Sequence, residues 1–193
     1  SAKEAVQAAE SLGYPVVVKA LGVAHKTEAG GVRLNLDSPN QVSSAVMEVS
    51  NLCESFMIEK MIDDVVAELI VGVARDEQFG PYLLLGGGGI LVEMMNDSAL
   101  LLLPTSKEQV LHALGQLTCA PLLTGFRGLP PADLSAAVDV ILSVANLVEK
   151  DPSSIIELDI NPLLLMAEGQ GVVAADALIR LNTKAIVERN PTT

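Results

Sequence analysis

Oxygen-bearing side chains suited to a divalent cation gather near the C-terminal end of the chain. Glu157, Asp159 and Asn161 alternate along an apolar stretch, and side chains two residues apart share one face of a strand. Asp176 closes the predicted hairpin that follows and is expected within reach of that face. Carboxylate plus amide oxygen suits Mg²⁺, which completes its shell with water and phosphate. The competing interpretation is a solvated strand end.

A lysine inside an apolar segment offers a positive charge, whereas the C-terminal group offers oxygen ligands. Lys19 lies in the predicted strand 15–20, whose other members are Pro, Val and Ala. One interpretation is an edge lysine that points to water, which is the usual environment of lysine. The other is a compact positive charge directed at a phosphate group.

The loop after this strand adds groups that suit an anion. Gly30 and Gly31 would let backbone N–H groups approach a phosphate closely, although a glycine pair before a strand is also an ordinary turn. His25 stands beside Lys26, whose charge favours a neutral, nucleophilic imidazole. A lone loop histidine can equally be a solvated side chain.

A third group of residues suits a nucleoside. Glu59, Lys60, Met61 and Ile62 end a predicted strand, where backbone groups can read an adenine edge while Met61 or Ile62 packs on the ring. Glu68 could accept hydrogen bonds from ribose hydroxyls. The alternative for this segment is an amphipathic edge strand. The glycine run 86–89 lacks the spacing of a P-loop, so no role is assigned to it.

Periodicity and cap signals predict the elements that must position these residues. Ser1 with Glu4, and Ser38 with Pro39 and Gln41, have the spacing of helix N-caps. The first third is predicted as helix, strand, strand, helix, strand, in the ranges 1–12, 15–20, 32–36, 38–53 and 56–62. The rest is predicted as strands at 66–73, 82–85, 90–94, 155–160, 163–166 and 172–175, with an apolar stretch at 99–103. Thr105 with Glu108 also has capping-box spacing and opens a predicted helix 105–117. The predicted helix 133–148 carries one apolar stripe, made of Leu134, Ala137, Val138, Ile141, Val144 and Val148.

This order predicts a mixed α+β (α/β) fold with two lobes. Strands do not alternate strictly with helices, so a purely parallel, doubly wound sheet is disfavoured. The predicted division gives a smaller lobe at 1–62 and a larger lobe with the metal site at 63–193, and ligands often bind between lobes. The chain opens directly on a helix, which suggests a piece of a larger protein or one subunit of several, with the smaller lobe incomplete at its N-terminus.

Composition excludes several classes of partner. Of the 193 residues, 50% are hydrophobic and 19% are charged, which fits a globular core and not a disordered chain. The net charge of −12 and the 3% of aromatic residues disfavour nucleic acid and anionic membranes. Cys53 and Cys119 show no paired spacing, and no secretory or membrane-spanning segment is recognisable, so a cytoplasmic location is expected.

Together these motifs resemble the ATP-grasp domain of the ADP-forming acyl-CoA synthetases, a family related to succinyl-CoA synthetase. The resemblance covers nearly the whole chain, and it rests on the order and spacing of many modest motifs. These motifs are the segments 13–19, 25–32, 68–72, 75–81, 86–93, 122–128 and 157–162.

The resemblance implies an ATP-grasp fold that holds ATP or ADP between two lobes. Lys19 would contact the phosphates together with the loop of Lys26, Gly30 and Gly31, and residues 59–62 and Glu68 would bind adenine and ribose. Asn161 and Asp176, with Asp159 nearby, would hold Mg²⁺. The family passes phosphate between nucleotide and acyl-CoA chemistry through a phosphohistidine in a separate CoA-binding part, and His25 matches a second phosphate carrier of some members.

Two further functions remain open at this point. Similar domains occur joined to protein acetyltransferase modules, so the chain could be a non-catalytic regulatory domain that binds nucleotide. A less favoured interpretation is another ATP-grasp carboxylate ligase, which the order of the motifs along the whole chain disfavours.

Overall fold

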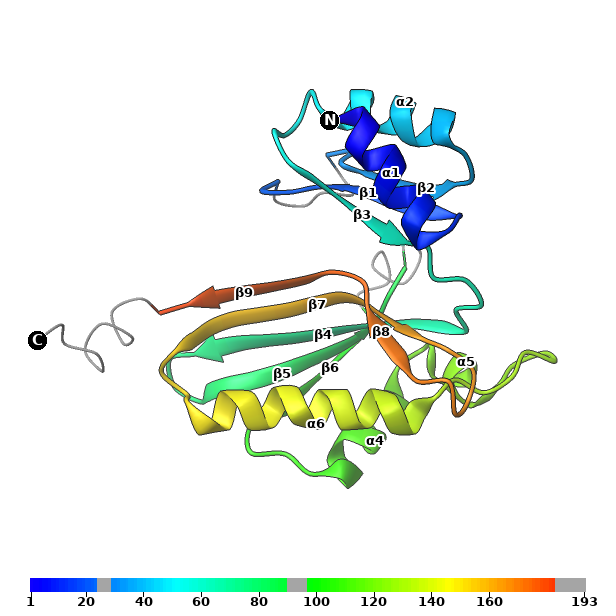
Figure 1. Cartoon of the computed structure of the whole chain (residues 1–193). Coiled ribbons are helices and arrows are strands. Elements are labelled where there is room, and N and C mark those ends of the chain that lie inside the picture. Colours follow the sequence, from blue (N-terminus) through cyan, green and yellow to red (C-terminus); the bar gives the residue numbers. More distant parts are fainter. Residues whose placement is uncertain (24–28, 90–96, 183–193) are drawn as a thin grey trace, which may run out of the picture. The chain divides into compact units, whose positions relative to one another are not determined.

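The chain divides into two compact units, Ser1–Asp63 (unit 1) and Asp64–Thr193 (unit 2). The computed structural model describes residues 1–23, 29–89 and 97–182 (Figure 1). His25, Lys26 and the predicted strand 90–94 therefore lie outside the described residues. The mixture of helices and antiparallel sheets agrees with the predicted fold class.

Unit 1 is a three-stranded antiparallel sheet with two helices on one face (Figure 1). The strand order is β2-β1-β3, so β1 is the central strand. The order of elements matches the predicted helix, strand, strand, helix, strand. The elements are α1 (Ala2–Leu12), β1 (Val16–Ala20), β2 (Val32–Leu36), α2 (Pro39–Val49) and β3 (Phe56–Lys60).

The helices of unit 1 begin where the cap signals predict. The Ser1 hydroxyl accepts from the backbone of Glu4 and forms a full capping box, and Ser38 accepts from Gln41. Helix α2 was predicted to run to about residue 53 but ends at Val49. The reason is a tighter turn, in which Leu52 N–H donates to the Val49 carbonyl three residues back.

The core of unit 1 lies between its sheet and its helices. Small side chains let the helices approach the sheet, and all five residues of β1 are buried. Because β1 also pairs with β2 on one edge and β3 on the other, it has no free edge and no exposed face. The buried apolar residues are Ala5, Ala9, Val16, Val18, Ala20, Leu36, Val42, Ala45, Val46 and Val49.

Unit 2 is a six-stranded antiparallel sheet with helices on one face (Figure 1). The strands are in the order β6-β5-β4-β7-β8, and β9 pairs with β7. The strands are β4 (Ala67–Asp76), β5 (Gly80–Gly87), β6 (Ser98–Leu102), β7 (Ile155–Leu165), β8 (Val172–Ala174) and β9 (Ala177–Leu181). The helices are α4 (Lys107–Gln116), α5 (Ala120–Thr124) and α6 (Leu134–Lys150).

The apolar stripe of α6 packs on the sheet of unit 2. The predicted stripe is confirmed, since Val138, Ile141 and Val148 are fully buried. Asp133 caps this helix: one carboxylate oxygen accepts from Ala136 N–H at 3.1 Å, and the other accepts from Gly171 N–H at 2.8 Å. These two bonds lower the pKa of the Asp133 carboxyl.

One predicted helix start in unit 2 is displaced by one residue, and two elements of this unit were not predicted. Helix α4 is capped by Ser106, with Gln109 completing the box, and not by Thr105 with Glu108. Both pairs have the same spacing, so the sequence pattern alone fits either one. Strand β9 and the short helix α5 were not predicted. All residues of β9 are exposed, so this strand lacks the alternating burial that creates a periodic pattern. Helix α5 has only five residues, which is too short for a helical periodicity to be recognised.

Strand β7 is a single strand of 11 residues, although the sequence predicted two strands joined by a turn at Asn161-Pro162. Leu163 pairs with Leu69 of β4 and Ile160 pairs with Val71, so two residues of β7 oppose one residue of β4. This β-bulge accommodates the proline without interrupting the strand.

Among the described residues, no helix is both long enough and apolar enough to cross a bilayer.

Candidate functional site

Lys19 is buried in the centre of unit 1, with only 8% of its surface exposed. Its ammonium forms an ion pair with the Glu59 carboxylate of β3. In the antiparallel register Lys19 pairs with Met57, and Glu59 is two residues further along β3, so the two charged side chains share one face. The interpretation of Lys19 as an edge lysine that points to water is therefore wrong.

The described end of the glycine loop is held beside Lys19 by hydrogen bonds. The Gly31 carbonyl accepts from the backbone N–H of Ala20 at 2.7 Å, and the Gly30 carbonyl accepts from Arg33 Nη1 at 2.5 Å. Arg33 Nε in turn donates to Glu48 of α2 at 2.8 Å. Gly30 has a φ of 70°, which favours glycine at this position. The loop that begins after β1 is thus tied at its C-terminal end to both β1 and α2.

Two polar groups of the segment predicted to bind adenine already contact other residues of unit 1. The Glu59 carboxylate is paired with Lys19, and the Met61 N–H donates to the Pro15 carbonyl at 3.0 Å. Lys60 is exposed, and Met61 and Ile62 are half-buried. Any adenine contact by this segment thus depends on its remaining backbone groups and on the apolar side chains of Met61 and Ile62.

In unit 2, Glu68, Asp159 and Asn161 share the sheet face opposite the helices. Leu69 and Val71 of β4 face the core, so Glu68 faces the other way. Leu158 and Ile160 of β7 also face the core. Asp159 and Asn161, which alternate with them, therefore lie on the face of Glu68.

Backbone pairing brings Asn161 and Asp176 together. The Asn161 N–H donates to the Asp176 carbonyl at 3.1 Å, and Asp176 Oδ1 accepts from Ala177 N–H at 3.0 Å. Asp159 pairs across the sheet with Gly72, where an added Cβ would lie 3.9 Å from Asp159 Oδ1. The same added Cβ would lie 3.5 Å from Leu84 Cβ, so a side chain at position 72 would contact both Leu84 and Asp159.

The chemistry of these donors suits a hard cation bound by few protein ligands. Asn161 and Asp176 offer an amide oxygen and a carboxylate, and Asp159 offers a second carboxylate. Glu157 instead forms a 3.1 Å ion pair with Arg180 of β9. Within the described ranges, no group of three or more histidine, cysteine, aspartate or glutamate side chains gathers as a metal site. Mg²⁺, which retains water and phosphate ligands, fits this set better than a metal that needs a closed cage.

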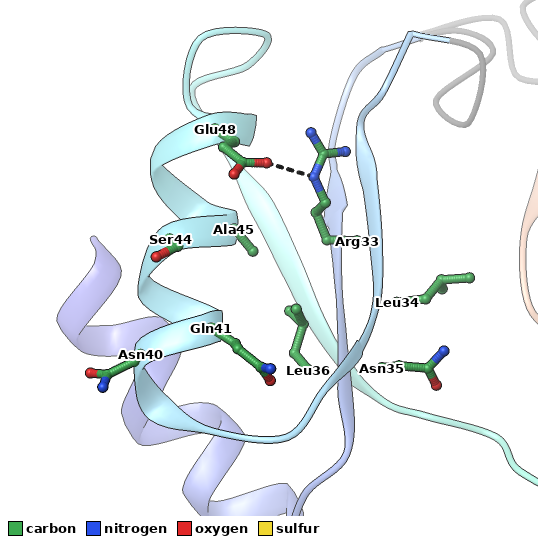
Figure 2. Close-up of a pocket in the computed structure, with 9 residues that line it drawn as sticks. All are labelled: Arg33, Leu34, Asn35, Leu36, Asn40, Gln41, Ser44, Ala45 and Glu48. Atoms are coloured by element: carbon green, nitrogen blue, oxygen red, sulfur yellow. Dashed lines mark hydrogen bonds and ion pairs between the residues drawn. The ribbon is translucent and has the colours of Figure 1, made fainter.

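Unit 1 also contains a hollow on its surface. It has a volume of about 390 Å³ and opens between β2 and α2, beside the ion pair of Arg33 and Glu48 (Figure 2). None of the predicted site residues lines it. The predicted site residues therefore do not form this hollow.

Sequence reasoning missed the pairing of Lys19 with Glu59. A buried ammonium requires a partner, and Glu59 is an acid in a neighbouring predicted strand, which is the signal that was available. The register between β1 and β3 was needed to choose it.

Comparison with known proteins gives a consistent result. An ATP-grasp domain model matches residues 1–181. The chain is 34% identical over 188 residues to the β subunit of acetate–CoA ligase (ADP-forming) II of Pyrococcus furiosus, covering 92% of this chain and 80% of that subunit. It is 37% identical over 190 residues to trans-feruloyl-CoA synthase FCS1 of an unknown prokaryotic organism, covering 93% of this chain.

Solved structures agree with these relatives. The dinucleotide-forming acetyl-coenzyme A synthetase 1 of Candidatus Korarchaeum cryptofilum, in complex with coenzyme A and Ca-AMPCP, superposes with a TM-score of 0.83 at 32% identity. The match covers 94% of this chain and 82% of that one. Another structure of that synthetase, with coenzyme A and Mg-AMPPCP, has its phosphohistidine segment pointing towards the nucleotide binding site and a TM-score of 0.77.

The length of the match differs between relatives. The chain spans 27% of the trans-feruloyl-CoA synthase and 26% of acetate–CoA ligase (ADP-forming) I of Archaeoglobus fulgidus. It spans most of the separate Pyrococcus furiosus subunit.

Proposed function

Because this chain belongs to the ATP-grasp domain family of the ADP-forming acyl-CoA synthetases, we propose that it is the part of such a ligase that binds ATP or ADP and exchanges a phosphoryl group with a histidine. The observation that carries the proposal is the match across 80% of an acetate–CoA ligase β subunit. The buried Lys19 is the feature of the chain's own structure that agrees with it best.

In the proposed nucleotide site, Lys19 of unit 1 meets the phosphates. Its ammonium is fixed by Glu59, so little side-chain freedom is lost when phosphate binds. Lys26, Gly30 and Gly31 supply further donors from the loop tied to β1. Met61 and Ile62 pack on adenine, beside Glu59 and Lys60, while Glu68 of unit 2 accepts from ribose hydroxyls.

Asp159, Asn161 and Asp176 would hold Mg²⁺ in this proposal. The support is their oxygen chemistry, the shared sheet face of Asp159 and Asn161, and the backbone bond between Asn161 and Asp176. When bound, Mg²⁺ neutralises charge on the phosphates. The contribution of the protein is to hold these donors in place through strand pairing.

His25 is the proposed phosphate carrier of this chain. A neutral imidazole nitrogen forms a bond to the γ-phosphorus of ATP as the bond from that phosphorus to the bridging oxygen breaks, and ADP leaves with the electron pair. The reverse step returns the phosphoryl group to ADP. The neighbouring charge of Lys26 favours the neutral imidazole. Catalysis of such a step is mainly positioning and charge stabilisation.

The whole ligase needs a partner in this proposal. A CoA-binding part that carries the main phosphohistidine, either fused to the chain or as a separate subunit, would complete acyl-CoA formation. The free thiols Cys53 and Cys119 are consistent with a reducing, cytoplasmic compartment. The relatives found are ligases, which favours this function over a regulatory domain of a protein acetyltransferase.

Phosphorylation by Mg-ATP tests the proposal. We expect the chain, incubated with γ-labelled Mg-ATP, to acquire acid-labile phosphate that is absent from His25→Ala, while Lys3→Met in the exposed part of α1 keeps the wild-type signal. ADP binding is measured by calorimetry on the same proteins. Binding without any labelled histidine, even with the CoA-binding part of a relative added, would end the carrier role, and failure to bind ADP or ATP would end the proposed function.

A further inference from the structure

The glycine run 86–89, to which the sequence assigned no role, lies directly against Glu68. Gly86 and Gly87 complete β5 and pair with Ile70 and Leu69 of β4. The next residue, Gly88, donates its N–H to the Glu68 carbonyl at 2.8 Å. The run therefore continues along β4 as far as the residue proposed to bind ribose.

Close approach is what requires glycine at position 88. A Cβ added to Gly88 would lie 2.8 Å from Glu68 Cβ and 3.1 Å from its backbone carbonyl carbon. Real Cβ atoms essentially never show a contact of 2.8 Å, and a contact of 3.1 Å is unusually tight. Neither atom belongs to a flexible side-chain end that could move away. A Cβ added to Gly115 of α4, in contrast, would meet nothing within 4 Å.

The next glycine lies beside the other end of the Glu68 side chain. A Cβ on Gly89 would be 3.7 Å from Glu68 Oε2, and Gly89 has a φ of 88°. The Glu68 side chain thus has Gly88 near its Cβ and Gly89 near its carboxylate. Two consecutive residues without side chains form one wall of the space that it occupies.

We infer that Gly88 and Gly89 are positioning residues that fix the direction of the Glu68 carboxylate and thereby make nucleotide binding depend on the ribose hydroxyls. The inference rests on the proposed function, in which Glu68 accepts from ribose. A side chain at either position changes the packing around Glu68 without removing its carboxylate. It therefore lowers the preference for ribose while leaving the phosphate contacts of Lys19 intact.

The test compares ADP with 2′-deoxy-ADP and 3′-deoxy-ADP by calorimetry on the full chain with Mg²⁺. We expect the wild type to bind ADP about tenfold more tightly than at least one deoxy analogue, since a hydrogen bond to a charged group has an effect of this size. In Gly88→Ala this preference falls to about twofold, whereas affinity for that deoxy analogue changes by less than about threefold. Gly115→Ala is the matched control and keeps the wild-type preference.

Two more variants separate the possible outcomes. Glu68→Gln should lose the preference, and adding Gly88→Ala to it should change the preference no further, because both act through one carboxylate. If Gly88→Ala does not fold, Gly89→Asn decides the question, since asparagine tolerates a positive φ and brings a side chain towards Glu68 Oε2. Its preference is expected to fall in the same way.

These results separate a failure of the inference from a failure of the proposed function. If Glu68→Gln loses the ribose preference but the folded glycine variants retain it, the positioning role is wrong and the ribose role of Glu68 stands. If the wild type has no preference, or Glu68→Gln keeps it, the ribose role fails and the inference fails with it. If ADP does not bind at all, the proposed function itself fails.

Discussion

Lys19 in unit 1 and Asp176 in unit 2 are charged groups held in two different ways. Lys19 is 8% exposed and is fixed by the carboxylate of Glu59. Asp176 is half-buried, and its backbone carbonyl accepts from Asn161 while its side chain accepts from the next residue along the chain. If Lys19 contacts phosphate as proposed, removing its side chain should disturb folding and binding together. Removing the Asp176 side chain leaves its backbone bond in place.

The largest expected effect follows from breaking the buried pair with Lys19→Met. The free energy of unfolding should fall by about 2 kcal/mol, because the partly buried Glu59 carboxylate then loses its ion pair with Lys19. This figure is reduced for the 34% exposure of the Glu59 side chain. ADP affinity should fall at least tenfold with the loss of a charge-assisted contact to phosphate. Urea unfolding and calorimetry measure the two effects.

The matched control for this variant is Lys3→Met, which removes a lysine from the exposed part of α1 in the same unit. Its stability and ADP affinity should remain close to wild type. Equal stability of Lys19→Met and wild type would mean that the ion pair with Glu59 contributes nothing to folding.

A smaller and more selective effect is expected from Asp176→Ala. Because the carbonyl of residue 176 still accepts from Asn161, the unfolding free energy should change by less than about 1 kcal/mol. The gain in ADP affinity on adding Mg²⁺ should fall about tenfold. Calorimetry with and without Mg²⁺ on this variant and on Asp139→Ala, an exposed acid of α6, makes the comparison. An unchanged Mg²⁺ dependence in Asp176→Ala would remove this residue from the metal site.

The smallest effect concerns Asp133, which belongs neither to the ion pair of Lys19 nor to the surroundings of Asp176. Its carboxylate accepts from two backbone N–H groups. Asp133→Asn should lower the melting temperature by roughly 3 °C at neutral pH, because a neutral amide is a weaker acceptor for the helix terminus. The folded-state pKa of Asp133 is lowered, so its contribution is present above its unfolded pKa and is lost as the pH falls through the folded value, below about pH 4.

Thermal melts between pH 2 and pH 7 check this prediction. The melting temperatures of wild type and Asp133→Asn should converge in the acid range and differ most near neutrality. A difference that stays constant across the acid range would mean that the ionised carboxylate contributes no more than the amide.

Local signals predicted much of the fold. The caps at Ser1 and Ser38 and the apolar stripe of α6 depend only on neighbours within the same element, and the structure confirms them. The bulge in β7 could not be predicted, because a proline after asparagine reads as a turn unless the neighbouring strand is known. The alternation of Leu158 and Ile160 correctly indicated a strand up to that point.

The candidate site, like the fold, could be predicted from local signals but not where it depends on a neighbouring strand. The sequence indicated that Lys19 was unusual for its strand, but excluding a water-facing edge lysine required its burial and its place in the central strand. The role of Gly88 depends on a distance to Glu68, 20 positions earlier in the chain, which only the pairing of β4 with β5 establishes. The assignments to adenine, ribose and metal stay predictions until ligands are measured.

The extra residue of β7 also limits how the length of this chain can vary. Ile160 and Leu163 are three positions apart and both point into the core, which the regular alternation of an uninterrupted strand does not allow. Deleting one residue at Pro162 would leave Asn161 alone opposite Ile70 and restore simple alternation, so both halves of the strand would keep their core-facing residues. A single deletion elsewhere in β7, with the bulge intact, would instead exchange core-facing for outward-facing side chains along part of the strand. One residue can therefore be lost at the bulge, or in the hairpin around Gly169, without altering any facing.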